Sequence, residues 1–371
     1  MEGVGLASAA ISAMALLALL STLGLDYGLI RFLPNAGAKA KDMINSSFII
    51  GGAVAIVLSL IFLAGLPFWS PALVSIREHT VFFAAFVIFI VATIFQTFAR
   101  QTFVAKRRTE FALWQGLIFG LLRFIPLVAL APFFQTFGIF ASWGIAVSIA
   151  MLFSIFFLLP KIQAGYRPLP AISKAAINEM LHFSFANYAA NIFWAIPTCI
   201  LPLMVVNILG AEQNAYFYIG WAVGSILFII PVAASFSLFA EGSYNQEKLD
   251  EDVRRSLKLT LLIIIPAIII IFFLGDKILL LFGTAYSENA TRLLQILAIS
   301  ALPLSLNYIY FGVRRVEMKM KSVIAMSVSI AIATLVLSYI LLPRIGIIGA
   351  GIAWLASQGI AALVVVRTLW K

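Results

Sequence analysis

The 371-residue chain has few of the side chains that support enzyme chemistry or metal binding. It contains one cysteine, Cys199, and two histidines, His79 and His182. A single thiol cannot form a disulfide within the chain, and the two histidines provide neither a metal cluster nor a Ser-His-Asp triad. No phosphate-binding loop ending in GKS or GKT occurs, which argues against an ATPase. The sequence therefore predicts a protein that is not an enzyme and that uses no cofactor and no metal.

Charge is also scarce. Charged residues make up 11% of the chain and hydrophobic residues 63%, whereas soluble domains carry about 25% charged residues. The apolar runs are about as long as the ~20 helical residues that cross a bilayer. The net charge of +10 comes from short loops rather than from one groove or face, so we expect no nucleic-acid partner. The composition predicts a protein of the lipid bilayer.

The apolar runs predict an all-α, polytopic fold with eleven visible transmembrane helices. Charged clusters separate these runs. The predicted spans are residues 5–25, 46–66, 81–99, 111–133, 138–159, 183–208, 215–239, 257–275, 292–312, 323–342 and 347–368.

Basic residues predict the orientation of these spans. Twenty of the 25 Lys and Arg fall in one alternating set of loops and termini, four fall in the opposite set, and Arg123 lies inside a span. Short cytoplasmic loops retain Lys and Arg. We therefore expect a multi-pass protein of the cell membrane with a cytoplasmic C-terminus.

The two halves of the chain resemble each other at an offset of about 210 residues. Residues 106–108 pair with Arg314-Arg315, and residues 137–146 pair with residues 345–354. Matching loops lie on the same predicted side, as in parallel repeats related by an axis along the membrane normal. This interpretation predicts an N-terminal lobe at 1–160, a cytoplasmic linker at 161–182 and a C-terminal lobe at 183–371. Two further patterns, Gly116–Gly120 and Gly220–Gly224, are typical of close helix packing.

The repeat also accounts for the odd number of spans. The second half has six predicted spans and the first half has five, and the partner of the 183–208 span would precede residue 1. We expect that the first helix of a twelve-helix protein is absent from this chain.

Three motifs resemble those of polysaccharide and oligosaccharide flippases, the Wzx-type branch of the MATE-like exporter superfamily. They are residues 23–34 (LGLDYGLIRFLP), residues 237–243 (SLFAEGS) and residues 346–354 (GIIGAGIAW). Apart from the absent first helix, the resemblance covers the whole chain. It implies a MATE-like two-lobe bundle that moves isoprenoid-linked sugars to the outer leaflet, driven by an H⁺ or Na⁺ gradient. The implied partners are the lipid-linked oligosaccharide, the bilayer and the coupling ion.

Arg123 is the first candidate substrate-binding residue. A charge inside a span costs about 2.5–3.5 kcal/mol on insertion scales, so it should face a cavity or a partner. Its guanidinium could bind the diphosphate of a lipid-linked sugar through a bidentate fork. A structural role is equally open, because Pro126 cannot donate a hydrogen bond to the carbonyl of residue 122.

Other candidates come from polar residues near or within the spans. Arg31 would by itself be an interfacial arginine, but the repeat aligns it with Glu241, so we expect the two to close a cytoplasmic gate. Arg31 also joins the expected substrate-binding set. Asn187 and Asn191 lie one turn apart beside Tyr188, and they would line the substrate path or join neighbouring helices. Weaker candidates for the same lining are Gln96, Tyr216, Tyr218, Asn307 and Tyr308.

Three other functions stay open. An ion-coupled, multidrug-type exporter of the same superfamily would need a carboxylate in the first half, and Asp26 is the one acidic residue near such a position. A membrane-embedded sugar polymerase or ligase would be expected to carry a long outer loop, whereas the longest outer loop here covers only residues 276–291. The third is a noncatalytic scaffold, such as an inactive flippase relative.

Overall fold

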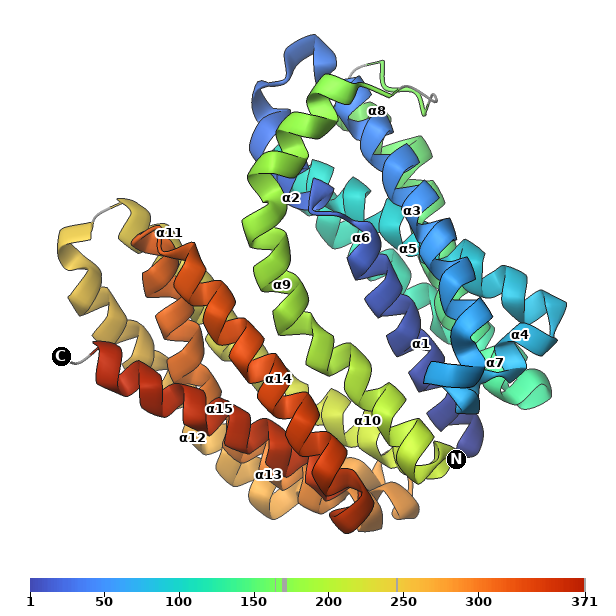
Figure 1. Cartoon of the computed structure of the whole chain (residues 1–371), viewed down its shortest axis with the longest axis vertical. Coiled ribbons are helices and arrows are strands. Elements are labelled where there is room, and N and C mark those ends of the chain that lie inside the picture. Colours follow the sequence, from blue (N-terminus) through green and yellow to red (C-terminus); the bar gives the residue numbers. More distant parts are fainter. Residues whose placement is uncertain (164, 169–171, 245, 370–371) are drawn as a thin grey trace. The chain divides into compact units, whose positions relative to one another are not determined.

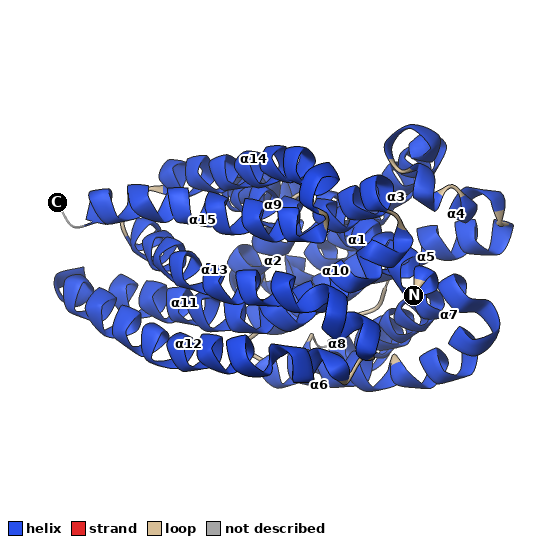
Figure 2. Cartoon of the chain, turned by 90° about the horizontal axis from the view of Figure 1, so that it is seen from below, coloured by secondary structure: helices blue, strands red, loops and turns tan. Residues whose placement is uncertain are grey.

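The computed structural model describes residues 1–163, 165–168, 172–244 and 246–369. These residues form helices joined by short turns, with no strand among them (Figures 1 and 2). The α-helices are α1 (Glu2–Ser21), α2 (Leu25–Phe32), α3 (Ala40–Trp69), α4 (Ser75–Glu78), α5 (Thr80–Ala105), α6 (Thr109–Leu122), α7 (Phe124–Phe153), α8 (Leu159–Ile162), α9 (Lys174–Leu209), α10 (Ala211–Ser225), α11 (Ile229–Tyr244), α12 (Leu249–Leu280), α13 (Thr284–Val316), α14 (Met320–Ile345) and α15 (Ile347–Leu369). Shorter 3₁₀ or π segments are η1 (Leu33–Asn35), η2 (Gly37–Lys39), η3 (Pro71–Leu73), η4 (Ser154–Leu158), η5 (Ile226–Phe228) and η6 (Gln246–Lys248).

The all-α polytopic prediction is confirmed. Ten helices in the described part of the chain are long and apolar enough to cross a bilayer. The difference from the eleven predicted spans arises at Thr109–Ile162, a continuous 54-residue helical stretch that contains both 111–133 and 138–159. Gln135 breaks this stretch with φ 41° and ψ −111°.

The break at Gln135 folds this stretch back on itself. The ring of Phe119 lies 5.4 Å from that of Trp143, and the Gln115 side chain donates to the Ser154 hydroxyl at 2.9 Å. The two arms therefore pack along each other as a helical hairpin. Arg123, between the end of α6 and the start of α7, keeps helical dihedrals, and its N–H donates to the Phe119 carbonyl.

The chain divides into two compact units, Met1–Ile192 and Phe193–Lys371. The division falls inside α9, which begins in the first unit and ends in the second without a break in its helical backbone (Figure 1). Pro197 and Pro202 lie in the part of α9 that belongs to the second unit.

In the first unit, α5 packs against α3 and α7, and α1 packs against α5 and α7. Phe140 of α7 is fully buried, and its ring contacts the rings of Phe82, Phe86 and Phe89 on α5 at centroid distances of 5.0, 6.0 and 5.5 Å. Gly144 lies one turn further along α7, where a Cβ would collide with the ring of Phe89. Helix association in lipid depends on such close packing rather than on expulsion of water.

In the second unit, α13 is the central helix, packed against α10, α11, α12 and α15. Gly220 and Gly224 of α10 give it room: a Cβ at Gly220 would meet Leu293 and Ala290 at 3.2 and 3.4 Å, and one at Gly224 would meet Leu297 at 3.0 Å. The predicted close packing is confirmed for this pair. The prediction of close packing was wrong for Gly116 and Gly120: among the described residues, a Cβ at either glycine would meet no atom within 4 Å.

Unusual backbone conformations recur in the two units at a spacing of 211 residues. Arg107 and Met318 have φ of 57° and 58°, and Gln135 and Gly346 have φ of 41° and 63°. The hydrogen bonds around the first pair also correspond. The N–H groups at positions 106 and 108 bond the carbonyls of 102 and 103, and those at 317 and 319 bond the carbonyls of 313 and 314.

The α6–α7 hairpin of the first unit and the packed pair α14 and α15 of the second unit share another feature at the same spacing. A Cβ on Gly138 would lie 2.5 Å from the Leu130 carbonyl oxygen, and one on Gly349 would lie 2.8 Å from that of Leu341. The backbone therefore pairs Gly138 with Gly349, three positions later than the pairing of Gly138 with Gly346 in the sequence comparison. The glycine-rich sequence around 346–351 is compatible with both alignments. The sequence comparison therefore aligned Gly138 with Gly346, whereas the backbone geometry aligns it with Gly349.

Candidate functional site

The helical backbone of the first unit is broken between α1 and α2, directly before the buried residue Asp26. Leu23 and Gly24 both have positive φ, at 50° and 79°, and positive φ ends the helix that α1 would otherwise continue. Gly24 also allows α9 to approach, because a Cβ there would lie 3.0 Å from the Cβ of Tyr188 and 3.1 Å from that of Ser184. The sequence Leu-Gly-Leu-Asp at 23–26 thus brings a turn and a carboxyl group against α9.

The break leaves backbone groups that find side-chain partners. In an unbroken helix the N–H of Gly24 would bond the carbonyl of Leu20. Here that N–H points to the Thr22 hydroxyl oxygen at 3.4 Å, and the Tyr188 hydroxyl donates to the Leu20 carbonyl at 2.6 Å. Buried backbone groups must be paired inside a bilayer, so Tyr188 performs this structural task for α1.

Asp26 follows the break and is buried, with 6% of its surface exposed. Its Oδ1 atom has no hydrogen-bond partner among the described residues, and neither has the Ser184 hydroxyl. Burial raises the pKa of Asp26 to about 6, although the backbone N–H of Tyr27 bonds the carboxylate and opposes the rise. Desolvation disfavours the charged form of a carboxyl group. Asp26 is therefore a carboxyl group that can take up and release a proton near neutral pH.

The second unit contains a buried pair of amides rather than a carboxyl group. The Asn307 side chain on α13 donates to the Gln358 side-chain oxygen on α15 at 2.7 Å and to its backbone carbonyl at 3.0 Å. Both side chains are fully buried. Asn307 Oδ1 and Gln358 Nε2 have no partner within the described chain, and buried polar atoms of this kind are normally matched by water or a ligand.

Aromatic side chains lie next to the amide pair. Trp194 on α9 contacts Tyr308, Phe311 and Trp354 at centroid distances of 4.8, 5.8 and 6.1 Å. Trp221 of α10 contacts Trp354 at 5.2 Å. The indole N–H of Trp354 is buried and has no acceptor among the residues described. The buried amide pair and the aromatic cluster therefore share helices α13 and α15.

Arg123 lies at the junction of α6 and α7 and is exposed. Its guanidinium lies over the ring of Phe124 at 5.2 Å from the centroid, and its other neighbours along the helix, Leu121, Ile125 and Val128, are exposed as well. No carboxylate pairs with Arg123 in the described chain. The structure leaves this guanidinium accessible to an anionic ligand.

The remaining predicted residues are distributed over both units. Arg31 lies on α2 in the first unit and is exposed, and Glu241 lies on α11 in the second, where Ser237 donates to its carboxylate at 3.3 Å. Asn191 is half-buried on α9. The side chain of Asn187 lies outside the described residues. Within the first unit, Tyr188 approaches the α1–α2 break and lies near Asp26.

The sequence pointed to Asp26 only as the acidic residue near the position that an ion-coupled exporter would need, and it did not single out Ser184, Trp194, Trp354 or Gln358. For Asp26 the signal was available, because Gly24 two residues earlier predicts an end to the helix. Trp194, Trp354 and Gln358 lie in apolar helices, and nothing in one sequence shows that α9, α13 and α15 bring them together.

Comparisons with known proteins agree with this architecture. The MatE family matches residues 189–340. A solved multidrug resistance MATE family transporter of the MOP superfamily, in an inward-facing conformation, has a TM-score of 0.74 at 14% identity and covers 100% of this chain and 92% of its own. The chain has the MATE-like transporter fold. This MATE-like chain also aligns with the lipid II flippase MurJ in an inward closed conformation, with a TM-score of 0.75, 11% identity, and coverage of 99% of this chain and 85% of that one.

A sequence relative matches about half of the chain. A putative O-antigen transporter of Shigella flexneri is 27% identical over 188 residues, which are 47% of this chain and 45% of that protein. The match thus spans less than half the length of this curated relative. With the MatE match and the fold, it confirms the predicted resemblance to the MATE-like exporter superfamily, in a chain with several helices long and apolar enough to cross a membrane.

Proposed function

We propose that this MATE-like protein flips isoprenoid-linked oligosaccharide or polysaccharide precursors from the cytoplasmic to the outer leaflet. The recurrence of backbone geometry at a spacing of 211 residues carries the mechanism, because it favours two repeated lobes that rock and give alternating access. The cargo rests on the O-antigen transporter relative and on the fold shared with a lipid II flippase. The lobes would be 1–160 and 183–371, joined by the linker 161–182, with the C-terminus in the cytoplasm.

Arg123 is the residue proposed to contact the diphosphate of the cargo. It is exposed, unpaired within the described chain and adjacent to apolar surface, a combination that suits a charged head group joined to an isoprenoid tail. A guanidinium binds such an oxyanion bidentately. Arg31, Asn187, Asn191 and Tyr188 would contribute polar contacts along the path.

The gate proposal joins Arg31 and Glu241. They carry opposite charges and belong to motifs that occupy comparable places in the two units, at the cytoplasmic ends of α2 and α11 in the predicted orientation. Attraction between them would hold the cytoplasmic side closed, and H⁺ or Na⁺ movement would drive the cycle. Charge reversal at both positions together should restore a function lost by either reversal alone.

The test is the distribution of lipid-linked sugar between leaflets. Deletion of the gene should leave the precursor in the inner leaflet, and Arg123→Ala should do so in part, because it removes the diphosphate contact. Arg123→Lys should retain more transport, since it keeps the charge without the planar fork. Arg344→Ala, which removes an exposed arginine at the end of α14, is the control. An unchanged leaflet distribution after deletion would refute the proposed cargo.

A second candidate function is supported by Asp26. A buried carboxyl group whose pKa is about 6 could couple proton movement to export of a small molecule, as the shared fold with a multidrug resistance transporter suggests. Drug-resistance profiles of the deletion strain separate the two candidates. Hypersensitivity to cationic drugs with normal precursor distribution would favour the exporter.

A further inference from the structure

The first three turns of α12 carry acidic residues followed by basic residues. Asp250, Glu251 and Asp252 lie in the first turn, where the positive end of the helix dipole stabilises carboxylates. Arg254 and Lys258 follow one and two turns later, and the dipole offers them no such stabilisation. Neither cation forms an ion pair with this acidic cluster within the described chain.

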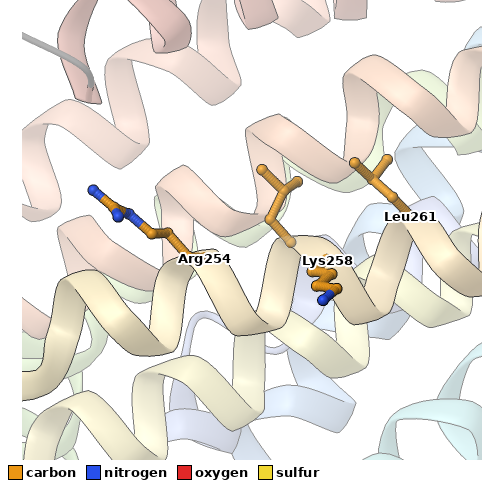
Figure 3. Close-up of a pocket in the computed structure, with 4 residues that line it drawn as sticks. Arg254, Lys258 and Leu261 are labelled. Carbon is orange, nitrogen blue, oxygen red and sulfur yellow. The ribbon is translucent and has the colours of Figure 1, made fainter.

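A cavity of about 580 Å³ opens beside these cations. It is lined by Arg254, Leu257, Lys258 and Leu261 (Figure 3). Residues three and four positions apart are neighbours on a helix surface, and the four lining residues follow each other along α12. Figure 3 shows Arg254, Lys258 and Leu261 along this helix. The cavity thus combines two cationic groups with two leucines.

The cations that line the cavity have no carboxylate partner within the described chain. Basic side chains elsewhere do: Arg108 pairs with Glu110, and Arg314 and Lys319 pair with Glu317. Arg254 and Lys258 are both exposed and are available to a ligand. A phosphate oxygen is the natural partner of an arginine fork and an ammonium group.

Apolar surface continues from the cavity along the same helix. Ile265, Ile269 and Phe272 lie at three- and four-residue steps beyond Leu261, and all three are exposed. From Lys258 to Phe272 the helix rises roughly 21 Å at 1.5 Å per residue. This distance exceeds the ~15 Å half-thickness of the hydrocarbon core. A hydrocarbon chain could follow this surface from the cations to the middle of the bilayer.

We propose that the cavity at the basic end of α12 binds an anionic phospholipid. Its phosphate lies between Arg254 and Lys258, and one acyl chain packs against Leu257, Leu261 and the exposed apolar surface of α12. Charge complementarity requires an anionic head group, and the apolar continuation opens to the surrounding bilayer, which points to a membrane lipid as the occupant. The inference does not depend on the proposed cargo.

The experiment is native mass spectrometry of the full-length protein in detergent, titrated with phosphatidylglycerol. The test variant is R254Q/K258Q. The matched control is K248Q/R255Q, which also removes one lysine and one arginine from this end of α12 but alters no residue that lines the cavity. A basic residue near a lipid surface contributes about a fivefold factor in binding. We therefore expect R254Q/K258Q to weaken binding about 30-fold, and the control to change it little.

A third variant tests the apolar half of the site. Leu261→Trp adds volume to the cavity without changing charge, and it should also weaken binding of phosphatidylglycerol. Phosphatidylcholine, whose head group has no net charge, should bind weakly to the unmodified protein. Each variant is first checked for a monodisperse size-exclusion profile.

Three results would overturn the proposal. Equal weakening in R254Q/K258Q and K248Q/R255Q would mean that only overall charge matters. Equal binding of phosphatidylcholine would remove the role of the anionic head group. Displacement of phosphatidylglycerol by an isoprenyl phosphate at more than tenfold lower concentration would assign the cavity to a substrate lipid instead.

Discussion

The two units each contain a helical hairpin, but the residues at the turn of the hairpin differ. Each has a helical hairpin whose turn requires positive φ, at Gln135 in the first unit and at Gly346 in the second. Glycine adopts such a conformation readily, whereas glutamine does so at a cost. The close approach of the two arms is nevertheless kept in both units by Gly138 and Gly349. The comparison indicates that contact between the arms is more demanding than the turn that joins them.

The units differ more in their buried polar groups. The first buries a carboxyl group, Asp26, at a broken helix, and the second buries the neutral pair Asn307 and Gln358 between continuous helices. Amide side chains do not titrate, whereas burial raises the pKa of the Asp26 carboxyl group to about 6. We infer that the stability of the first unit depends on pH through Asp26, whereas the amide pair adds no pH dependence to the stability of the second unit.

The largest expected effect comes from closing the space between the hairpin arms. Gly138→Val and Gly349→Val each place a side chain against the backbone of a facing residue, so each should cost about 3 kcal/mol or more of stability. Thermal unfolding in detergent would measure this. Gly116→Val and Gly120→Val are the controls, because open space surrounds both positions. Similar losses in all four variants would show that helix propensity, rather than contact, dominates.

The next effect concerns Asp26. Its pKa rises from 3.8 in the unfolded chain to about 6 in the folded protein, so the folded state holds the proton more tightly. The associated stability is fully present below pH 3.8 and is lost as the pH rises through 6, by roughly 2 to 3 kcal/mol. Asp26→Asn should remove this dependence and be more stable than the unmodified protein at pH 8. Parallel pH profiles of unfolding temperature for the two proteins would contradict the assignment.

A comparable test in the second unit uses the amide pair. Asn307→Ala leaves the Gln358 side chain buried without its partner, and an unpaired buried amide should cost roughly 2 kcal/mol. Gln358→Leu combined with Asn307→Leu should recover part of that loss, because both polar groups are then gone. Unlike Asp26→Asn, none of these changes should alter the pH profile of unfolding. A double-mutant cycle from pH 5 to 8 measures both points.

The smallest effect contrasts the two turns directly. Gly346→Ala should destabilise the second hairpin by about 1 to 2 kcal/mol, because φ is 63° and ψ −152° there. Gln135→Gly should stabilise the first by about 1 kcal/mol, since glycine relieves the same strain. Changes of opposite sign in the free energy of chemical unfolding would support this difference between the two turns, and changes of the same sign would contradict it.

Much of the fold could be predicted because the bilayer imposes simple rules. Apolar length located the helices that are long enough to cross the membrane, and the two spans predicted at 111–133 and 138–159 meet where Gln135 breaks the 109–162 stretch. The candidate site was harder to predict. Tyr188 was selected for polarity, yet its hydroxyl bonds the Leu20 carbonyl, a partner created by a kink more than 160 residues earlier. Long-range contacts of this kind leave no pattern in one sequence.

Helix α9 limits how this protein can be dissected. Its backbone continues across the boundary at Ile192 and Phe193, with Tyr188 bonded to α1 and Trp194 packed against α13. Two polypeptides divided at that boundary would each end in mid-helix, with up to four N–H or four C=O groups newly without partners. Neither piece would carry the whole helix that its neighbours require, so co-expressed halves should reassemble better when the cut is placed in a loop outside α9.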